Sequence, residues 1–188
     1  MIVRRVFDLL AAAGVLVVSL PLWPLIALVI KIDSEGPVFY VQKRVGKEER
    51  VFLLIKFRSM IKNAEEHGAV WAGENDWRIT RTGKVLRRCH LDELPQLINV
   101  IKGEMSLVGP RPERPEFVAE LKRLIPDFGR RHQVKPGLTG WAQVKFPYAS
   151  SPEESKEKLE YDLFYIRKRN VLFDIKILLK TIRKLFAG

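Results

Sequence analysis

Hydrophobic residues divide the chain into an apolar N-terminal segment and a mixed remainder. From Leu9 to Ile30 the sequence reads LLAAAGVLVVSLPLWPLIALVI, 22 residues without a charge. At about 1.5 Å per residue, a helix of this length matches a bilayer core of about 30 Å. The segment therefore predicts attachment to a membrane.

The middle of this segment contains helix-breaking residues. Ser19, Pro21 and Pro24 lie near its centre, and each proline removes a helical hydrogen bond. A helix that breaks there and returns to the same membrane face also explains why positive charge gives no preferred direction of insertion. Basic residues lie on both sides of the segment: Arg4 and Arg5 before it, and Lys31, Lys43, Arg44 and Lys47 after it.

Three other interpretations of the segment stay open. A cleavable signal peptide is one, although no A-x-A-like site follows and Asp8 precedes the apolar run. A straight or kinked membrane span is another, because neighbouring structure can satisfy a proline-broken helix in a membrane. A buried helix of a soluble protein is the third, but the run exceeds the usual length of one. The pattern favours the re-entrant hairpin.

Beyond Ile32 the pattern is that of an α+β protein, mostly helical with one small β-hairpin. Gly46-Lys47-Glu48 lies between the stretches PVFYVQKRVG and ERVFLLIKFRSM, which predicts a hairpin of two short strands. Clusters of Pro and Gly predict loops. The predicted strands are 37–46 and 49–60, the predicted helices are 60–67, 92–103, 116–125 and a run from Pro152, and the predicted irregular segments are 68–82, 106–115 and 135–140.

The last segment predicts an amphipathic helix. Its apolar row and its basic row lie on opposite faces, which is the pattern of a helix at the surface of an anionic membrane. A surface helix packed on the core is equally compatible with the pattern, and the apolar N-terminal segment favours the membrane. The apolar row is Ile175, Leu178, Leu179, Ile182, Leu185 and Phe186, and the basic row is Lys176, Lys180, Arg183 and Lys184.

Composition narrows the class of protein. Lys and Arg number 33 against 22 Asp and Glu, a formal charge of +11. This excess favours nucleic acid, an anionic membrane or a phosphorylated substrate as partner. A mean hydropathy of −0.06 excludes a polytopic membrane protein. The single cysteine, Cys89, excludes an intramolecular disulfide.

Candidate chemistry concentrates in residues 86–115, because the chain has no GxxxxGK[ST], GxGxxG, HExxH, CxxC or GxSxG motif. Asp92 and Glu93 are adjacent, and Pro95 follows in the first turn of the predicted helix. A helix N-terminus favours negative charge, either of a phosphoryl group or of an acidic side chain. Asp92 as a simple helix cap is therefore the alternative to a catalytic role.

Basic residues near the carboxylates support phosphate chemistry. Arg87 precedes the pair, Arg111 lies between two prolines, and Lys56 and Arg58 lie in a predicted strand. Guanidinium groups on rigid backbone suit bidentate phosphate recognition. A diphosphate substrate also favours Mg²⁺, which takes one or two carboxylates together with phosphate oxygens. A solvated basic surface is the alternative, but it does not explain a guanidinium on a proline-stiffened loop.

Four motifs in the same order resemble the bacterial sugar transferase family, whose members are monotopic polyprenol-phosphate phosphoglycosyl transferases. The similarity covers nearly the whole chain and is greatest with the minimal form, which lacks additional N-terminal membrane helices. The motifs are KFRSM (56–60), LDELPQLINVIKGEMSLVGPRP (91–112), KPGLTGWAQV (135–144) and KLEYDLFYI (158–166).

The resemblance implies a re-entrant membrane helix in residues 1–32 and a catalytic domain in 33–188. Such enzymes transfer a sugar 1-phosphate from a UDP-sugar to undecaprenyl phosphate, release UMP and initiate assembly of a membrane-bound glycan. By the match, Asp92 is the nucleophile that forms an aspartyl phosphosugar, and Glu93 helps to hold Mg²⁺. The candidate phosphate- and nucleotide-binding residues are Lys56, Arg58, Arg87, Arg111 and Asp162, with the role of Asp162 the least defined.

The resemblance also implies a location at the cytosolic face of the bacterial inner membrane, with membrane lipid as a further partner. A membrane-anchored protein that binds nucleic acid or lipid is the competing hypothesis. We expect no nucleic acid partner, because aromatic residues are not interleaved with the basic ones. The oligomeric state stays open, with a homodimer as a candidate. Selectivity for the sugar is expected from residues 68–77 or 146–152.

Overall fold

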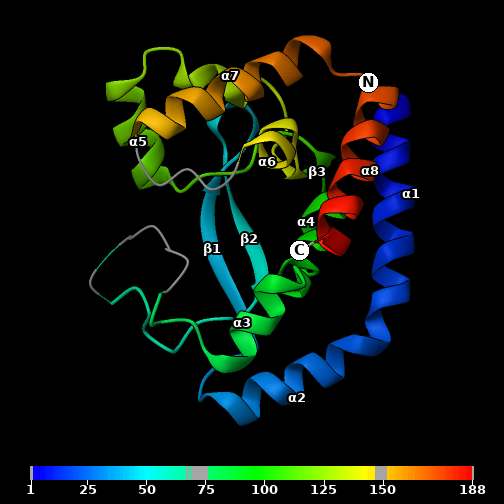
Figure 1. Cartoon of the computed structure of the whole chain (residues 1–188), viewed down its shortest axis with the longest axis vertical. Coiled ribbons are helices and arrows are strands. Elements are labelled where there is room, and N and C mark those ends of the chain that lie inside the picture. Colours follow the sequence, from blue (N-terminus) through cyan, green and yellow to red (C-terminus); the bar gives the residue numbers. More distant parts are fainter. Residues whose placement is uncertain (1, 67, 69–75, 147–151, 188) are drawn as a thin grey trace.

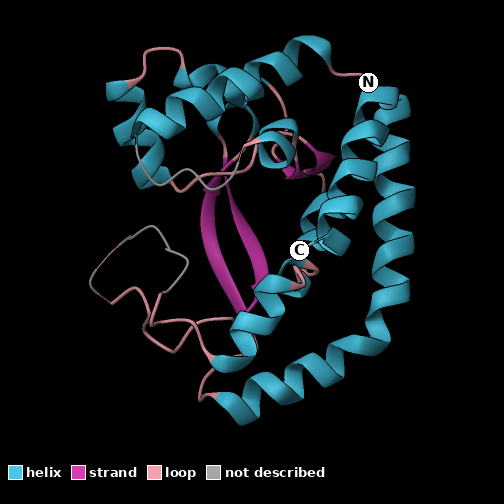
Figure 2. Ribbon diagram, in the orientation of Figure 1, coloured by secondary structure: helices cyan, strands magenta, loops and turns pink. Residues whose placement is uncertain are grey.

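The computed structural model describes residues 2–66, 68, 76–146 and 152–187. As predicted, this part of the chain is α+β, with helices around two small two-stranded sheets (Figure 2). In chain order the elements are α1 (Ile2–Ser19), α2 (Trp23–Asp33), β1 (Phe39–Val45), β2 (Val51–Phe57), α3 (Arg81–Arg88), α4 (Gln96–Lys102), β3 (Ser106–Val108), α5 (Pro115–Leu124), β4 (Gly137–Thr139), α6 (Trp141–Lys145), α7 (Pro152–Lys168) and α8 (Val171–Ala187), with 3-10 turns at Leu20–Leu22, Lys47–Glu49, Leu91–Glu93 and Phe128–Gln133.

The apolar N-terminal segment forms two helices, α1 and α2, joined by a bend at the 3-10 turn (Figure 1). Pro21 lies in the turn and Pro24 in the first turn of α2, where a missing N–H costs no helical hydrogen bond. The Trp23 indole donates to the Ser19 hydroxyl at 3.3 Å, which ties the two sides of the bend together. The run Ile2–Asp33 is long and apolar enough to cross a membrane, and most of it is exposed. The interruption lies within the interval that the sequence predicts.

The predicted hairpin is confirmed and stands at the centre of the domain (Figure 1). β1 and β2 are antiparallel, with Phe39 opposite Phe57 and Val45 opposite Val51. Phe52 and Leu54 of β2 are buried in the core, whereas the residues between and before them are exposed. This alternation, with one buried face, is the period of a strand.

A second sheet occupies segments that the sequence analysis predicts as loops. β3 and β4 pair in parallel, within the predicted irregular segments 106–115 and 135–140. Strands of three residues are too short to show an alternating pattern, so the prediction of loops was wrong there. The strand ends approach closely, and a Cβ on Gly137 would lie 2.0 Å from the Gly109 nitrogen. Glycine at this position is therefore required by packing.

Between residues 60 and 103, the helix predicted for 60–67 was wrong, and the one predicted for 92–103 was right except for its start. Residues 62–66 form turns, because Met60 pairs with Ile79 in a β-bridge and Asn63 has a positive φ of 63°. The helix expected from Asp92 begins at Gln96, and a separate 3-10 turn carries Asp92.

The C-terminal helices enclose the domain, as their patterns predict. α5 corresponds to the predicted 116–125, and α7 crosses one end of the hairpin (Figure 1). α8 buries Ile177 in the main core but exposes Ile175, Leu179 and Ile182. It therefore both packs on the core and presents an apolar row outward. The side chains of residues 185–187 lie outside the described part.

Candidate active site

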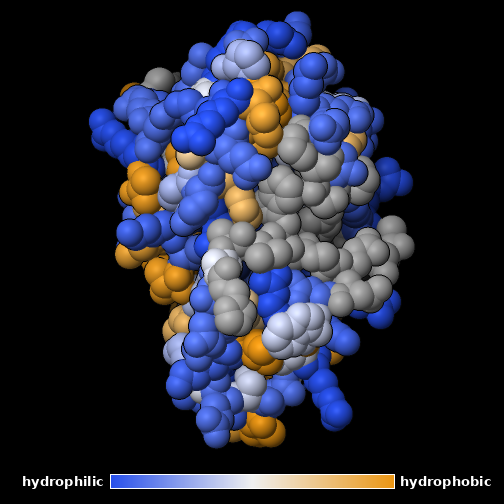
Figure 3. All heavy atoms as spheres, turned by 90° about the vertical axis from the view of Figure 1, so that its left-hand side faces the viewer, coloured by the Kyte–Doolittle hydropathy of each residue, from blue (hydrophilic) through white to orange (hydrophobic). Residues whose placement is uncertain are grey.

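One large open cleft contains all of the predicted site residues. Its walls come from the hairpin, the α3–α4 region, the loop after β3, and α7. On the side of the molecule that carries α5, the described residues present a mostly hydrophilic surface with several hydrophobic patches (Figure 3). The predicted residues in the cleft wall are Lys56, Arg58, Arg87, Asp92, Glu93, Arg111 and Asp162.

The Asp-Glu pair lies on the 3-10 turn between α3 and α4. His90 precedes it in the left-handed region, with φ of 53°, and Pro95 follows as the N-cap of α4. The alternative that Asp92 is merely the cap of this helix is therefore wrong. The turn instead holds two adjacent carboxyl groups at the base of the cleft, where Asp92 is 5% exposed.

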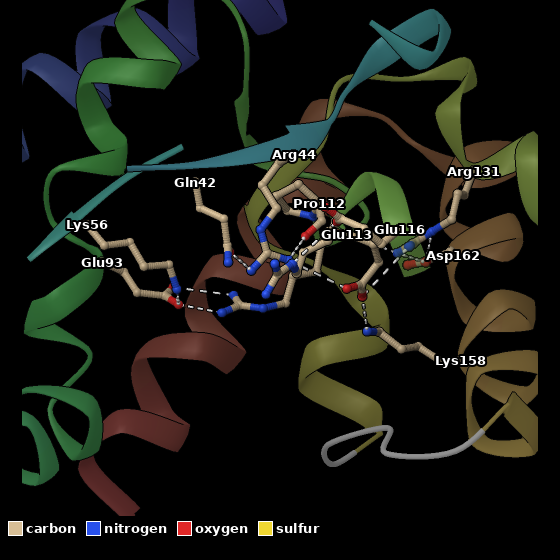
Figure 4. A network of polar contacts seen from close by, with 12 residues as sticks. Gln42, Arg44, Lys56, Glu93, Pro112, Glu113, Glu116, Arg131, Lys158 and Asp162 are labelled. Atoms are coloured by element: carbon tan, nitrogen blue, oxygen red, sulfur yellow. Dashed lines mark hydrogen bonds and ion pairs between the residues drawn. The ribbon is translucent and has the colours of Figure 1, made fainter. Parts of the chain in front are cut away.

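Glu93 is ion-paired on two sides (Figure 4). The Lys56 Nζ lies 3.0 Å from Glu93 Oε1, and an Arg111 nitrogen lies 2.5 Å from the same oxygen. Burial opposes ionisation of Glu93, but the charges of Arg111 and Lys56 outweigh it and hold the pKa of Glu93 well below its usual range. Glu93 is therefore a fixed anion that joins β2 to the loop after β3.

Asp92 is in a different state from its neighbour. Among the described residues it forms no ion pair within 4.0 Å, although Lys56, Arg87 and Arg111 act on it through space. Burial raises the pKa of the Asp92 carboxyl; the charge of Lys56 opposes this rise, and that of Glu93 adds to it. Two adjacent carboxylates in different environments are suited to different chemical roles.

Two of the predicted arginines, Arg58 and Arg87, form hydrogen bonds to other segments of the protein. Arg58 donates through its guanidinium to the Ser34 carbonyl at 2.7 Å and to the Glu35 carbonyl, so it fastens the end of α2 to the end of β2. Arg87 donates through Nε to the Ser59 hydroxyl at 2.8 Å. Both arginines line the cleft. Arg58 bonds to backbone carbonyls and so has a structural role, whereas Arg87 bonds to a side chain.

A second charged cluster, which the sequence analysis missed, supports the loop of Arg111. Arg131 and Asp162 form a buried ion pair at 2.7 Å, and each side chain is 2% exposed. Arg131 also donates to the Arg111 carbonyl at 2.9 Å. Asp162 therefore acts on the site through Arg131, and its expected contact with nucleotide stays a prediction.

Glu113 is the other anion of this cluster (Figure 4). Lys158 lies 3.0 Å from its carboxylate and Arg44 lies 3.7 Å from it. Burial opposes its ionisation, but Lys158, Arg131 and Arg44 lower the pKa of Glu113 to about 2. These residues come from β1, α7 and the segment before β4, so no local pattern could associate them.

Comparison with known proteins identifies the family of this chain. A family model described as "Bacterial sugar transferase" matches residues 1–188. The chain belongs to the bacterial sugar transferase family.

Several relatives of this sugar transferase carry descriptive names. Identity is 46% to the UDP-N-acetylgalactosamine-undecaprenyl-phosphate N-acetylgalactosaminephosphotransferase of Aeromonas hydrophila, over 99% of this chain and 44% of that protein. Identity is 41% to the UDP-glucose:undecaprenyl-phosphate glucose-1-phosphate transferase of Escherichia coli, over 100% of this chain and 41% of that protein. Identity is 36% to the exopolysaccharide production protein PSS of Rhizobium leguminosarum, over 97% of this chain and 94% of that protein. The chain thus spans less than half of the first two relatives and nearly all of the third.

A magnesium ion fits the donor set of this sugar transferase only in part. The described residues contain no group of three or more His, Cys, Asp or Glu side chains that could hold a metal ion. Asp92 and Glu93 provide two adjacent carboxylates, and Mg²⁺ in such sites takes one or two carboxylates with phosphate oxygens from the substrate. The pair would therefore suffice only for a metal that takes its other ligands from a bound diphosphate, and Mg²⁺ stays a prediction.

Of the two segments expected to select the sugar, Phe146 at the start of the second lines the cleft. Of 68–77 and 146–152, residues 69–75 and 147–151 lie outside the described part of the chain.

Proposed function

We propose that this chain transfers a sugar 1-phosphate from a UDP-sugar to undecaprenyl phosphate, releases UMP, and so initiates assembly of a membrane-bound glycan. The observation that carries this proposal is the asymmetry of the two carboxylates. Glu93 is held by two cations, whereas Asp92 has no ion-pair partner among the described residues and faces the same cleft. The names of the relatives describe transfers of this class.

In the proposed first step, an Asp92 carboxylate oxygen attacks the phosphorus that bears the sugar. The bond from this phosphorus to the UMP oxygen breaks, UMP leaves with the electron pair, and an aspartyl phosphosugar remains. Arg87 and Arg111 line the same cleft as Asp92 and act on it electrostatically, and we expect them to stabilise the charge that develops on the phosphoryl oxygens.

In the proposed second step, a phosphate oxygen of undecaprenyl phosphate attacks the same phosphorus and the Asp92 carboxylate leaves. Glu93 keeps Lys56 and Arg111 in place throughout. In the first step, Mg²⁺ held by Glu93 and by the diphosphate of the UDP-sugar would neutralise charge on the departing UMP.

The proposed location is the cytosolic face of the bacterial inner membrane. The acceptor keeps its polyprenyl tail in the bilayer, whereas UDP-sugars are cytosolic, so the catalyst must act at the boundary. The exposed apolar side chains of α1, α2 and α8 suit lipid, and the net charge of +11 suits anionic headgroups.

A substrate assay tests the activity. Membranes that contain the protein should release UMP from at least one of a panel of UDP-sugars when undecaprenyl phosphate is added, because the first step frees UMP. EDTA should stop the release and Mg²⁺ should restore it. Release no greater than from membranes without the protein, with every sugar tested, would contradict the function. Full activity in EDTA would contradict the metal alone.

Cysteine labelling tests the re-entrant topology. In a Cys89→Ser background, single cysteines at Val3 and Ile32, which are 70% and 77% exposed, should react with an impermeant maleimide from the same side. The physical reason is that a segment broken at Leu20–Leu22 returns to the face it entered. Inverted vesicles should label at both positions and intact spheroplasts at neither. Labelling from opposite sides would show a membrane span.

A further inference from the structure

The charged residues of the otherwise apolar α1 all contact the catalytic domain. Arg4 lies 2.7 Å from the Asp174 carboxylate, and Arg5 donates to the Val100 carbonyl at 2.6 Å, near the end of α4. Asp8 is the most buried of the three, at 8% exposure. A carboxylate is costly to bury unless hydrogen bonds compensate it. Asp8 is therefore held at a defined point of the domain.

That point is the outer edge of β3. The Ser106 hydroxyl donates to Asp8 Oδ2 at 2.7 Å, and the Leu107 amide donates to Asp8 Oδ1 at 3.1 Å. On its other edge β3 pairs with β4, where the Ser106 amide donates to the Pro136 carbonyl. The carboxylate thus takes the place of a neighbouring strand for the amide that points away from β4.

The chain between β3 and Arg111 is short and tightly packed. The Gly109 amide donates to the Thr139 carbonyl at 2.9 Å, and the Gly137 amide donates to the Pro110 carbonyl at 2.9 Å. A Cβ on Gly109 would lie 2.5 Å from the Lys135 carbonyl oxygen. There is little room for the loop to move independently, so a displacement of β3 is passed on to Arg111.

We propose that Asp8 is a positioning residue for the transfer: from the membrane-anchoring helix it holds β3 and, through β3, places Arg111 against Glu93. Tyr165 also links α1 to β3. Its hydroxyl donates to the Val108 carbonyl at 2.9 Å and accepts a hydrogen bond from Arg4 of α1. Other charged groups near Asp8 are Arg5, Lys135 and Asp174. The arrangement couples the seating of α1 to the geometry of the active site.

This inference rests on the proposed function for its kinetic test, which measures the first turnover of UMP release from a UDP-sugar without acceptor. Asp8→Asn removes the negative charge that strengthens both hydrogen bonds to β3, so the rate constant should fall about tenfold while the amplitude, which counts active molecules, stays at the wild-type value. Ser106→Ala, which keeps the Leu107 contact, should cause a smaller fall. The double variant should lose no more than Asp8→Asn alone, because both changes act through one contact.

Asp127→Asn is the matched control, since the Asp127 carboxylate is exposed, pairs only with the neighbouring Arg130 at 3.4 Å among the described residues, and lies outside the anchor. It should keep the wild-type rate constant. A fall in amplitude or membrane-bound fraction in Asp8→Asn, with an unchanged rate constant, would show that Asp8 only stabilises or anchors the protein and would overturn the inference.

Hydrogen exchange of the full chain in phospholipid vesicles provides a test that needs no turnover. The amides of Leu107, Val108, Gly109 and Arg111 should exchange faster in Asp8→Asn than in the wild type or in Asp127→Asn. Unchanged exchange there would also overturn the inference. A wild-type protein that releases no UMP from any UDP-sugar would instead count against the proposed function, and the exchange result would then decide the inference by itself.

Discussion

Asp92→Asn is expected to abolish the transfer and also the release of UMP in the absence of acceptor lipid, each by a factor of at least about 10³. The asparagine amide has nearly the same size but is not a nucleophile, so no aspartyl phosphosugar can form. The measurement is a time course of UMP release in membranes, with and without undecaprenyl phosphate.

Asp127→Asn provides the matched control, because Asp127 carries an exposed carboxylate that pairs with Arg130 at 3.4 Å. It should retain wild-type activity. A burst of UMP from Asp92→Asn, equal in size to that of the wild type, would remove Asp92 as the nucleophile. A normal thermal unfolding temperature of Asp92→Asn would show that its loss of activity is chemical.

Asp162→Asn should cause the largest loss of stability, about 3 kcal/mol, because it leaves the Arg131 guanidinium buried without its closest anion. For a chain of this length the unfolding temperature should fall by roughly 10 °C. Thermal unfolding in detergent, followed by circular dichroism, measures it. Asp127→Asn, whose pair is exposed, should change stability by less than about 0.5 kcal/mol.

A double variant separates structure from nucleotide binding. Asp162→Leu with Arg131→Met removes both charges and should recover much of the stability that Asp162→Asn loses. If Asp162→Asn instead unfolds like the wild type and only weakens the affinity for UDP-sugar, the contact with nucleotide implied by the family resemblance applies to this residue and the structural role does not.

The elements that sequence predicts well are those with a long local pattern. β1 and β2 are seven residues each and lie on either side of a glycine-containing turn, and α5 repeats its apolar positions over three turns. β3 and β4 have three residues each, and their pairing joins segments about thirty residues apart. Their formation depends on tertiary contact, which no local window contains.

For the candidate site, too, the local motif could be predicted from the sequence, whereas the long-range contacts could not. Asp92 and Glu93 are adjacent in sequence, and their motif is long enough to identify the family. The partners that set their states come from elsewhere: Lys56 from β2 and Arg111 from the loop after β3. The contact of Asp8 with Ser106 spans 98 positions. Only the folded chain shows which of its many basic residues form ion pairs with an anion and which form hydrogen bonds to backbone carbonyls.

The docking of Asp8 also fixes how deep the proposed anchor reaches. α2 has 11 residues, and the part of α1 beyond Asp8, Leu9–Ser19, is equally long. At about 1.5 Å per residue each arm measures roughly 16 Å, about half of a hydrocarbon core of about 30 Å. Such a wedge displaces lipid from one leaflet and leaves the other intact. Its insertion energy therefore depends on the difference in lateral pressure between the two leaflets. The anchor should favour a membrane whose surface is convex on the side of the domain.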